Sequence, residues 1–407
     1  MTGYACPMPT INLNQLRDEA NALRGQLVAV RRDLHAHPEL AFQEVRTAGI
    51  VADKLNQLGF EVQTGVGKTG VIGLLEGALP ADKPLTLLLR FDMDALPIHE
   101  QVDVEFASQS EGKMHACGHD AHTSIGLAVA EMMAKHRDQW AGVAKFVFQP
   151  AEEIGRGARA MIDDKVLESP QPDRALSVHV WSMMETGNVI MTDGPQMAGS
   201  RAFNIVVRGR GAHGATPQFG ADPIVAAAQI ITALQTIVSR NVDPLEGSVV
   251  TVGSIHGGSA ANIIPDEVTM QGTIRAFTEE VLALLIKRIG EIAASVAAAL
   301  GVSAEAKFTD DGTPPVSNDP AMSALVREIA GDLVGAANVH NGFRTMGAED
   351  AAYFLKAAPG AYVIVGAGNK AKGMTEPHHS PRFQIDEDSL PLAVTLLTAS
   401  AIKMLED

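Results

Sequence analysis

Apolar residues recur along the chain in two patterns, one typical of buried strands and one typical of helices. Short, nearly continuous apolar runs are expected for the central strands of a sheet that is covered on both faces. The predicted strands are 60–62, 71–75, 85–91, 144–148, 175–181 and 361–365. The predicted helices are 12–34, one that begins at Pro38 and ends near Leu58, 125–133, 321–333 and 390–405. This pattern predicts an α/β fold with helices packed against a central sheet.

The order of the elements changes between residues 196 and 310. Strand, helix, strand, strand, helix and strand follow one another there, which is the order of a ferredoxin-like unit. These elements are expected at 203–207, 222–240, 248–255, 267–277, 279–300 and 302–308. A chain of 407 residues also exceeds the length of one ordinary core. We therefore expect a discontinuous first domain, 1–195 and 311–407, with a second domain, 196–310, inserted into it.

Composition and charge narrow the kinds of partner that the protein can have. Hydrophobic residues make up 46% of the chain, and the formal net charge is −16. The sequence has no basic arm, so nucleic acid and anionic membranes are poor partners. The two cysteines, Cys6 and Cys117, cannot build a disulfide framework for a chain of this length. Because the sequence also lacks a signal-peptide pattern, we expect a soluble cytoplasmic protein.

The stretch 114–124 contains a thiol, three imidazoles and a carboxylate within eight residues. One glycine separates Cys117 from His119, so a tightly turned or extended backbone can point both side chains at one centre. The helix predicted next would begin beside this cluster, with Thr123 or Ser124 as its cap. Its N-terminus would favour the thiolate form of the cysteine. Taken alone, such a stretch is more often a buried thiol beside surface histidines than a metal site.

Acids and further histidines accompany the predicted strands. Asp92 and Asp94 follow one strand, Glu152 and Glu153 follow the next, and His179 lies inside a third. Because ligands of open α/β sheets gather at the carboxyl ends of strands, we expect these side chains to lie close together. Taken alone, a histidine inside an apolar strand is more often a core residue than a ligand. Other histidines stand in predicted turns and loops, namely His35, His37, His378 and His379.

Five motifs together resemble one enzyme family. They are RDLHAHPEL at 32–40, DMDALP at 92–97, HACGHDAH at 115–122, FQPAEE at 148–153 and HHSP at 378–381. Over nearly its whole length the chain resembles the two-metal metallopeptidases of the aminoacylase and glutamate carboxypeptidase type. The similarity is to the amidohydrolase branch, with hippurate hydrolases, N-acyl-L-amino acid amidohydrolases and auxin-conjugate hydrolases. It implies a zinc-peptidase-like catalytic domain with a mixed central sheet, and an inserted ferredoxin-like α+β domain that serves as lid and dimerisation domain.

The resemblance also implies roles for the residues of the site. Glu152 would be the general base, and Asp94 would hold a ligand imidazole in one tautomer. Adjacent acids on an extended segment point to opposite sides, so Glu153 could bind metal while Glu152 faces the substrate water. The implied metal ligands are Cys117, His119, Glu153, His179 and His379.

Several points of the metal site stay open at this stage. The motif favours His379 over its neighbour His378 as the ligand. Many relatives in the wider family carry a histidine where Asp92 stands and a bridging aspartate at or near Cys117, and this chain departs from that pattern at both places. We expect two divalent ions per subunit, zinc, manganese, cobalt or nickel, because thiolate and imidazole favour zinc whereas carboxylates tolerate manganese. The histidines without an assigned role are His35, His37, His115 and His122.

The implied reaction is hydrolysis of the amide bond of an N-acyl amino acid, hippurate-like or N-acetylated, by metal-activated water. In the inserted domain, His213 would donate a hydrogen bond to the oxyanion, and Asn262 and Arg275 would bind the substrate carboxylate. The two alanine-rich helices of that domain have more apolar surface than one sheet face covers. We therefore expect a homodimer, or a dimer of dimers, in which His213 reaches the active site of the partner subunit.

Two other functions remain open from the sequence. A dipeptidase, an aminoacyl peptidase or an acetyl-amino-acid deacetylase would use the same metal chemistry with a different pocket. A non-catalytic protein that binds acylated amino acids would keep the metals without needing a base. The presence of Glu152 favours an enzyme over such a binding protein.

Overall fold

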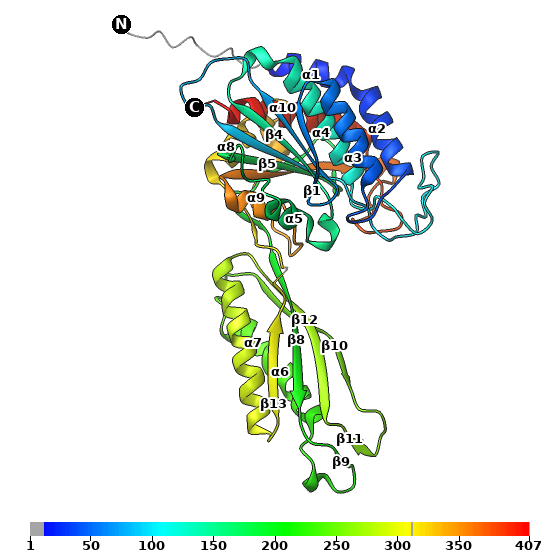
Figure 1. The fold of residues 1–407 in the computed structure, drawn as a ribbon, viewed down its shortest axis with the longest axis vertical. Coiled ribbons are helices and arrows are strands. Elements are labelled where there is room, and N and C mark those ends of the chain that lie inside the picture. The colour runs from blue at the N-terminus through cyan, green and yellow to red at the C-terminus, as the bar shows by residue number, and fades with distance from the viewer. Residues whose placement is uncertain (1–11, 311, 407) are drawn as a thin grey trace. The chain divides into compact units, whose positions relative to one another are not determined.

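The computed structural model describes residues 12–310 and 312–406, so Cys6 lies outside the described residues. The chain divides into two compact units (Figure 1). The first unit comprises the described residues up to Gly194, together with Ser317–Phe343 and the residues from Asp350 onward. The second, here called the inserted unit, comprises Pro195–Val316 and Arg344–Glu349.

A mixed sheet of eight strands forms the centre of the first unit, in the order β1-β2-β4-β3-β5-β16-β6-β15. Its strands are β1 Glu61–Val66, β2 Gly70–Glu76, β4 Val143–Gln149, β3 Thr86–Asp92, β5 Arg174–Glu185, β16 Gly360–Gly368, β6 Val189–Ile190 and β15 Val339–His340. The central strands β4, β3, β5 and β16 run parallel to one another, and every residue of β3 and β16 is buried. The apolar runs in the sequence therefore predicted the parallel, doubly covered part of the sheet correctly.

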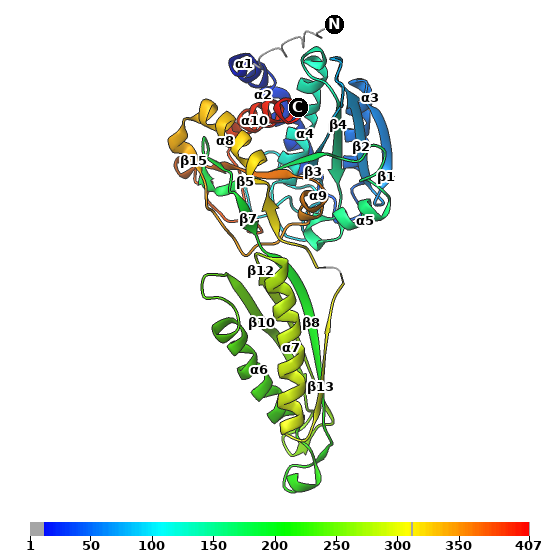
Figure 2. The same cartoon turned by 90° about the vertical axis from the view of Figure 1, so that its left-hand side faces the viewer.

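Helices cover both faces of this sheet (Figure 2). Helices α4 and α10 pack against each other and are buried almost throughout, whereas the shorter α5 and α9 lie on the other face. The helices of the unit are α1 Leu13–Ala22, α2 Arg24–Ala36, α3 Val45–Gln57, α4 His119–Lys135, α5 Gly157–Asp163, α8 Pro320–Val334, α9 Ala352–Ala357 and α10 Leu390–Met404. The mixed sheet between helical layers confirms the α/β class expected from the sequence.

Two helix predictions near the N-terminus were wrong in their bounds. The stretch 12–34 forms two helices that meet at Leu23, and the second contains Gly25, a poor helix former, near its start. No helix begins at Pro38; the next one begins at Val45. The physical reason is the side chain of Glu39, which accepts hydrogen bonds from the first free N–H groups of that later helix.

The inserted unit contains a four-stranded antiparallel sheet in the order β10-β12-β8-β13. Its elements are β8 Gly199–Arg208, α6 Pro223–Arg240, β10 Ser248–Gly257, β12 Glu267–Ala276, α7 Glu279–Ala299 and β13 Ser303–Phe308. The first and third strands lie at the centre, as in a ferredoxin-like fold, and the apolar faces of α6 and α7 share one core with the sheet. Short strands elsewhere are β7 Gly194–Met197, β9 Ala212–His213, β11 Ile263–Ile264 and β14 Val316–Asn318.

Among the described residues, one helix, α6, is long and apolar enough to cross a membrane by length and composition alone. Its buried residues, which include Ala226, Ile230, Leu234 and Ile237, belong to the core of the inserted unit. Core helices pass the same test of length and composition, so the helix is weak evidence for a membrane span.

A buried guanidinium joins three segments of the first unit. Arg90, on β3, donates to Asp92 Oδ2 at 2.6 Å, to Gln149 Oε1 at 2.8 Å and to Asp350 Oδ1 at 3.1 Å. All four residues are at most 1% exposed. Asp350 also accepts a hydrogen bond from the backbone N–H of Ala158. Removing this one cation would take a hydrogen-bonded positive charge away from two buried carboxylates.

We predict that Arg90→Met lowers the free energy of unfolding by about 3–5 kcal/mol, because the carboxylates of Asp92 and Asp350 stay buried. Urea unfolding followed by circular dichroism measures the change. The matched control is Arg46→Met, which breaks an ion pair with Asp33 whose side chains are 39% and 45% exposed. That control should cost less than about 1 kcal/mol. Equal losses in the two variants would contradict the role of burial.

Candidate metal centre

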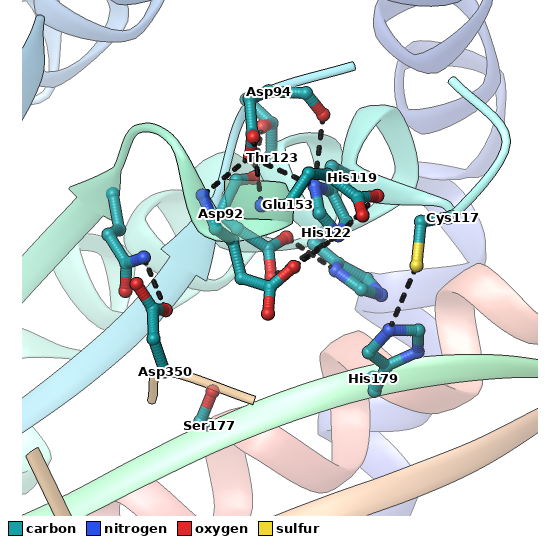
Figure 3. A network of polar contacts seen from close by, with 12 residues as sticks. Asp92, Asp94, Cys117, His119, His122, Thr123, Glu153, Ser177, His179 and Asp350 are labelled. Atoms are coloured by element: carbon teal, nitrogen blue, oxygen red, sulfur yellow. Dashed lines mark hydrogen bonds and ion pairs between the residues drawn. The ribbon is translucent and has the colours of Figure 1, made fainter. Parts of the chain in front are cut away.

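The metal-type side chains of the first unit converge beside the ends of β3, β4 and α4 (Figure 3). In several groups of described side chains, the ligand atoms within the group lie within 4.8 Å of one another, and three of these groups consist entirely of site residues expected from the sequence. The groups are Cys117, His119 and His179; Cys117, Glu153 and His379; and His119, Glu152 and Glu153. All five ligands expected from the sequence belong to these groups, together with the expected base, Glu152. Because two of the groups share Cys117, the arrangement can hold two neighbouring cations.

A tight turn at Gly118 points the thiol and the first imidazole at this centre. Gly118 has φ 89°, and a Cβ atom there would lie 2.5 Å from Val180 Cγ2, so no other residue fits without displacement. Helix α4 begins directly afterwards at His119, and the expected cap at Thr123 or Ser124 was wrong. Their hydroxyls instead donate to the carbonyls of Asp92 and Leu27.

Two histidines of the centre have their tautomers set by neighbouring oxygens. His119 Nδ1 donates to the backbone oxygen of Asp94 at 2.9 Å, and Oδ1 of the same aspartate lies 3.2 Å from this nitrogen. His179 Nδ1 donates to the carbonyl of Val180 at 2.7 Å, and its Nε2 lies 3.5 Å from Cys117 Sγ. In both rings Nδ1 is occupied by a backbone oxygen, so Nε2 is the nitrogen that faces the centre and could bind a cation once it carries no proton.

The paired acids lie on a 3₁₀ turn and not on an extended segment, so the expectation that they point to opposite sides was wrong. Ala151 has φ 54°, and the turn η2, Glu152–Ile154, follows it. Asp94 Oδ1 and Oδ2 accept the backbone N–H groups of Glu152 and Glu153, each at 3.0 Å. As a result, one oxygen of each glutamate lies 3.9 Å from His119 Nε2.

Two buried atoms of the centre give a direct test of whether a cation fits. His119 Nε2 and Glu153 Oε1 are buried, and neither has a hydrogen-bond partner among the described residues. They face each other at 3.9 Å, a separation too long for a hydrogen bond. An imidazole nitrogen and a carboxylate oxygen that face each other in this way suit a divalent ion of the zinc or manganese kind, which would take the place of the imidazole proton.

The structure distinguishes the two neighbouring histidines of the HHSP motif. His378 Nε2 donates to the carbonyl of Val180 at 3.0 Å, and burial lowers its pKa to about 4. His379 Nε2 lies 3.3 Å from Glu153 Oε2, and this contact raises the pKa of His379. The geometry therefore favours His379 as the residue that could bind metal.

Three further histidines have polar partners that explain them without a metal. His122 donates from Nδ1 to Asp92 and accepts the backbone N–H of Val180 at Nε2, so both ring nitrogens are used. His35 contacts Asp120 and Glu100, one carboxylate at each ring nitrogen. The third, His37, contacts the backbone oxygen of Asp33.

His115, also within the motifs, is 1% exposed and has no hydrogen-bond partner among the described residues. Burial lowers its pKa to about 3, and the ring lies outside the three ligand groups. Near neutral pH this side chain is therefore a neutral, buried imidazole beside the centre.

Asp92, which stands where relatives in the wider family carry a histidine, lies with Oδ2 3.7 Å from His119 Nε2, but other side chains engage both of its oxygens. Its Oδ1 accepts from His122 at 2.6 Å and its Oδ2 accepts from Arg90 at 2.6 Å. Burial raises the pKa of Asp92, but the charges of His119 and Arg90 outweigh burial and hold that pKa well below its usual range. Asp92 is therefore a buried anion that orients His122 and neutralises the charge of Arg90.

The two ligand imidazoles, His119 and His179, differ in their pKa values before any metal binds. Burial lowers the pKa of His119, but the charge of Asp92 and the hydrogen bond with Asp94 outweigh burial and raise it to about 10. Burial and the nearby His122 and His378 lower the pKa of His179 well below its ordinary value. In the metal-free protein His119 thus carries a proton that a cation must displace, whereas His179 is already neutral.

The three site residues expected in the inserted unit do not form one cluster there. His213 and Asn262 lie together, because β9 pairs with β11 and Gly214 N–H donates to the carbonyl of Asn262. His213 is exposed, and its Nδ1 accepts the N–H of Ala215, so Nε2 carries the proton and can donate. Arg275 lies near the end of β12, half-buried, and burial lowers its pKa.

The sequence reading missed several residues that support the centre. Arg90, Glu44 and the backbone N–H of Val180 contact the site residues or the backbone beside them, yet the sequence singled out none of the three for a role in the site. An arginine inside an apolar strand was the one signal in the sequence that could have pointed to the first of these.

A metal centre with a neighbouring carboxylate base, on an α/β fold with an inserted unit, is typical of metal-dependent hydrolases. Comparison with known proteins identifies the family. The pattern of the family described as "Peptidase family M20/M25/M40" matches residues 88–403. The chain belongs to this family, which confirms the resemblance found in the sequence.

Individual relatives agree with this assignment. The chain is 38% identical over 383 residues to IAA-amino acid hydrolase ILR1-like 4 of Arabidopsis thaliana, covering 93% of this chain and 86% of the relative. It is 38% identical over 396 residues to N-acetyl-L-cysteine deacetylase of Bacillus subtilis, covering 96% and 92%. Among solved structures, the YXEP protein of Bacillus subtilis, described as a dinuclear metal-binding peptidase, shares 33% identity with a TM-score of 0.82 over 95% of this chain and 99% of its own.

We predict that the two ligand imidazoles differ in protonation at pH 8 in metal-free protein. Nitrogen-15 NMR should show His119 with both ring nitrogens protonated, because its pKa is raised to about 10. His179, the internal control, should be neutral with the proton on Nδ1. Stoichiometric zinc should then remove the Nε2 proton of His119, and apparent metal affinity should rise with pH up to that pKa. A neutral His119 in metal-free protein at pH 8 would contradict the electrostatic account.

Proposed function

We propose that the protein hydrolyses the amide bond of N-acyl amino acids and releases a carboxylic acid and a free amino acid. The single observation that carries this proposal is the convergence of Glu152 on the same centre as five metal-type ligands. The names of the two relatives denote enzymes that act on amino acids with an acylated nitrogen. Hippurate-like and N-acetylated amino acids are the substrates that we propose to test first.

Five side chains would hold two divalent cations, drawn from zinc, manganese, cobalt or nickel. These are Cys117, His119, Glu153, His179 and His379. When bound, the cations would polarise the scissile carbonyl group and acidify a water molecule. A thiolate and three imidazoles beside one carboxylate favour a borderline ion such as zinc over calcium or magnesium.

The chain's own groups divide the remaining work. Glu152 accepts a proton from the attacking water at its carboxylate and returns it to the nitrogen of the leaving amine. The carboxylate of Asp94 accepts the backbone N–H of Glu152 and contacts Nδ1 of His119. These contacts hold both residues in place during the reaction. This preorganisation keeps the proton acceptor beside the metal ligands.

The inserted unit is proposed as a lid and dimerisation domain. His213 would donate from Nε2 to the oxyanion, while Asn262 and Arg275 would bind the carboxylate of the substrate. Strands β10 and β13 form the edges of its sheet, and α6 exposes Ile224 and Val225 to 43% and 51%. An open sheet edge and exposed apolar helix residues support a homodimer, or a dimer of dimers, through this unit. A cytoplasmic location is part of the same proposal.

A peptidase is the second candidate, because the solved YXEP structure is described as a peptidase and uses a dinuclear metal site. A dipeptide would present a free amino group where an N-acyl amino acid presents an apolar acyl chain. The two candidates share every residue of the metal centre, so substrate preference distinguishes them.

We predict that metal-loaded protein releases free amino acid from hippurate or N-acetyl amino acids faster than from dipeptides. A panel assayed with added zinc, manganese, cobalt or nickel tests this. Glu152→Gln should lose turnover by a factor of about 10³ or more while it keeps its metal content, since the base is lost and the ligands remain. Cys117→Ser is the contrasting control, in which metal content and activity should fall together. Loss of metal from Glu152→Gln would show that Glu152 is a ligand.

We predict that the active site is completed by the partner subunit. Mixing inactive Glu152→Gln and His213→Ala subunits should restore activity, because one site of each mixed dimer then contains both wild-type residues. By symmetry, each mixed dimer should regain about half of the wild-type activity. Mass spectrometry or differently tagged subunits verify the exchange. If exchange occurs and activity does not return, His213 acts within its own chain or the dimer is wrong.

A further inference from the structure

Glu44 is a buried acid that the reaction proposed above does not use. It lies just before α3, in the segment after the RDLHAHPEL motif, and its exposure is 0%. Oε1 accepts the backbone N–H groups of Phe42 at 3.0 Å and Ala151 at 2.9 Å, and Oε2 accepts the hydroxyl of Thr69 at 2.5 Å. Both carboxylate oxygens are therefore engaged, and one bond reaches a residue 107 positions away.

The backbone groups that Glu44 binds belong to residues in an unfavourable conformation. Phe42 has φ 61° and Ala151 has φ 54°, both in the left-handed region that residues with a Cβ avoid. Thr69 follows Lys68, which has φ 81°. Such residues are energetically unfavourable and persist where surrounding contacts determine them. The carboxylate of Glu44 supplies these contacts at two of the three positions and at the residue next to the third.

Ala151 is the residue immediately before the base. Its N–H is bound by Glu44, and the next two N–H groups, of Glu152 and Glu153, are bound by Asp94. Two buried carboxylates thus hold three consecutive N–H groups, and these define the direction in which the turn η2 leaves β4. A displacement of Ala151 would move the base and a proposed ligand together.

We propose that Glu44 is a positioning residue that fixes Ala151 in the left-handed conformation and so aims the carboxylates of Glu152 and Glu153 at the metal centre. The role of Glu152 in this statement rests on the function proposed above. The effect on Glu153 does not depend on it, because a change in the direction of Glu153 is detectable in the bound metal without any substrate.

Conservative replacements separate the shape of Glu44 from its charge. Glutamine has the same length as Glu44 and no charge, whereas aspartate has the charge and a shorter side chain. Glutamine keeps an oxygen for the two backbone N–H groups, and the Thr69 hydroxyl can rotate to accept from its amide. Aspartate keeps the charge but is shorter by one methylene group, so its carboxylate cannot reach Ala151 and Thr69 together.

The experiment compares Glu44→Gln, Glu44→Asp and Glu39→Ala in cobalt-substituted and zinc-loaded protein. Glu39 is the matched control, since it lies in the same segment and also accepts two backbone N–H groups, but those of Arg46 and Thr47 in α3. In Glu44→Asp we expect a changed visible cobalt spectrum and a kcat reduced about a hundredfold, with KM and metal content retained. Glu44→Gln should keep the wild-type spectrum and a kcat within about threefold, because the hydrogen bonds survive. Glu39→Ala should lower the unfolding midpoint without changing the spectrum or kcat.

The outcomes are distinct. An unchanged cobalt spectrum and kcat in Glu44→Asp would overturn the proposal, and so would equal spectral changes in Glu39→Ala. If Glu44→Asp does not fold, Thr69→Val removes one bond to the same carboxylate, and an unchanged cobalt spectrum there would overturn the proposal as well. If wild-type protein hydrolyses no N-acyl amino acid but the cobalt spectrum still responds to Glu44→Asp, the proposed function fails and the positioning role stands.

Discussion

The carboxylate of Asp94 is the interaction on which the metal centre depends. It contacts His119 Nδ1 at 3.2 Å and accepts the N–H groups of Glu152 and Glu153 at 3.0 Å each. One buried acid therefore fixes a ligand on α4 and two acids on the turn after β4, which are far apart in sequence. Its own place is set by the end of β3 in the parallel core of the sheet. Because the core of the sheet is tightly packed, Asp94 and the residues that it binds are held in fixed positions.

Sequence patterns predicted the parts of the molecule that depend on periodicity and on residue type. The apolar runs identified the parallel strands, because a strand covered on both faces has no polar side. The spacing of Cys117 and His119 pointed to a metal centre only together with the acids and histidines at the strand ends and the family resemblance. The family assignment and the α/β fold are confirmed by the comparison with relatives of more than 30% identity along nearly the whole chain.

Other parts could not be predicted, because they depend on long-range hydrogen bonds to the backbone. The turn at Glu152 and Glu153 looked extended in the sequence, but the carboxylates of Asp94 and Glu44 impose a left-handed residue and a 3₁₀ turn. The helix expected at Pro38 begins at Val45 because Glu39 caps it from a distance. Local propensity gives no information on a partner that arrives from another segment.

The backbone N–H and C=O of Val180 give different roles to three histidines that are chemically alike. Its carbonyl accepts from His179 and His378, and its N–H donates to His122, so each ring is left with a different free atom or none. Which ring nitrogen remains available is therefore set largely by two backbone groups, an acceptor and a donor, of one residue. Substitution of the valine would alter packing beneath Gly118 but could not exchange the acceptor and the donor. A slip of β5 by one residue would instead move the side chain of His179 to the other face of the sheet, so the register of a central strand also specifies the coordination chemistry.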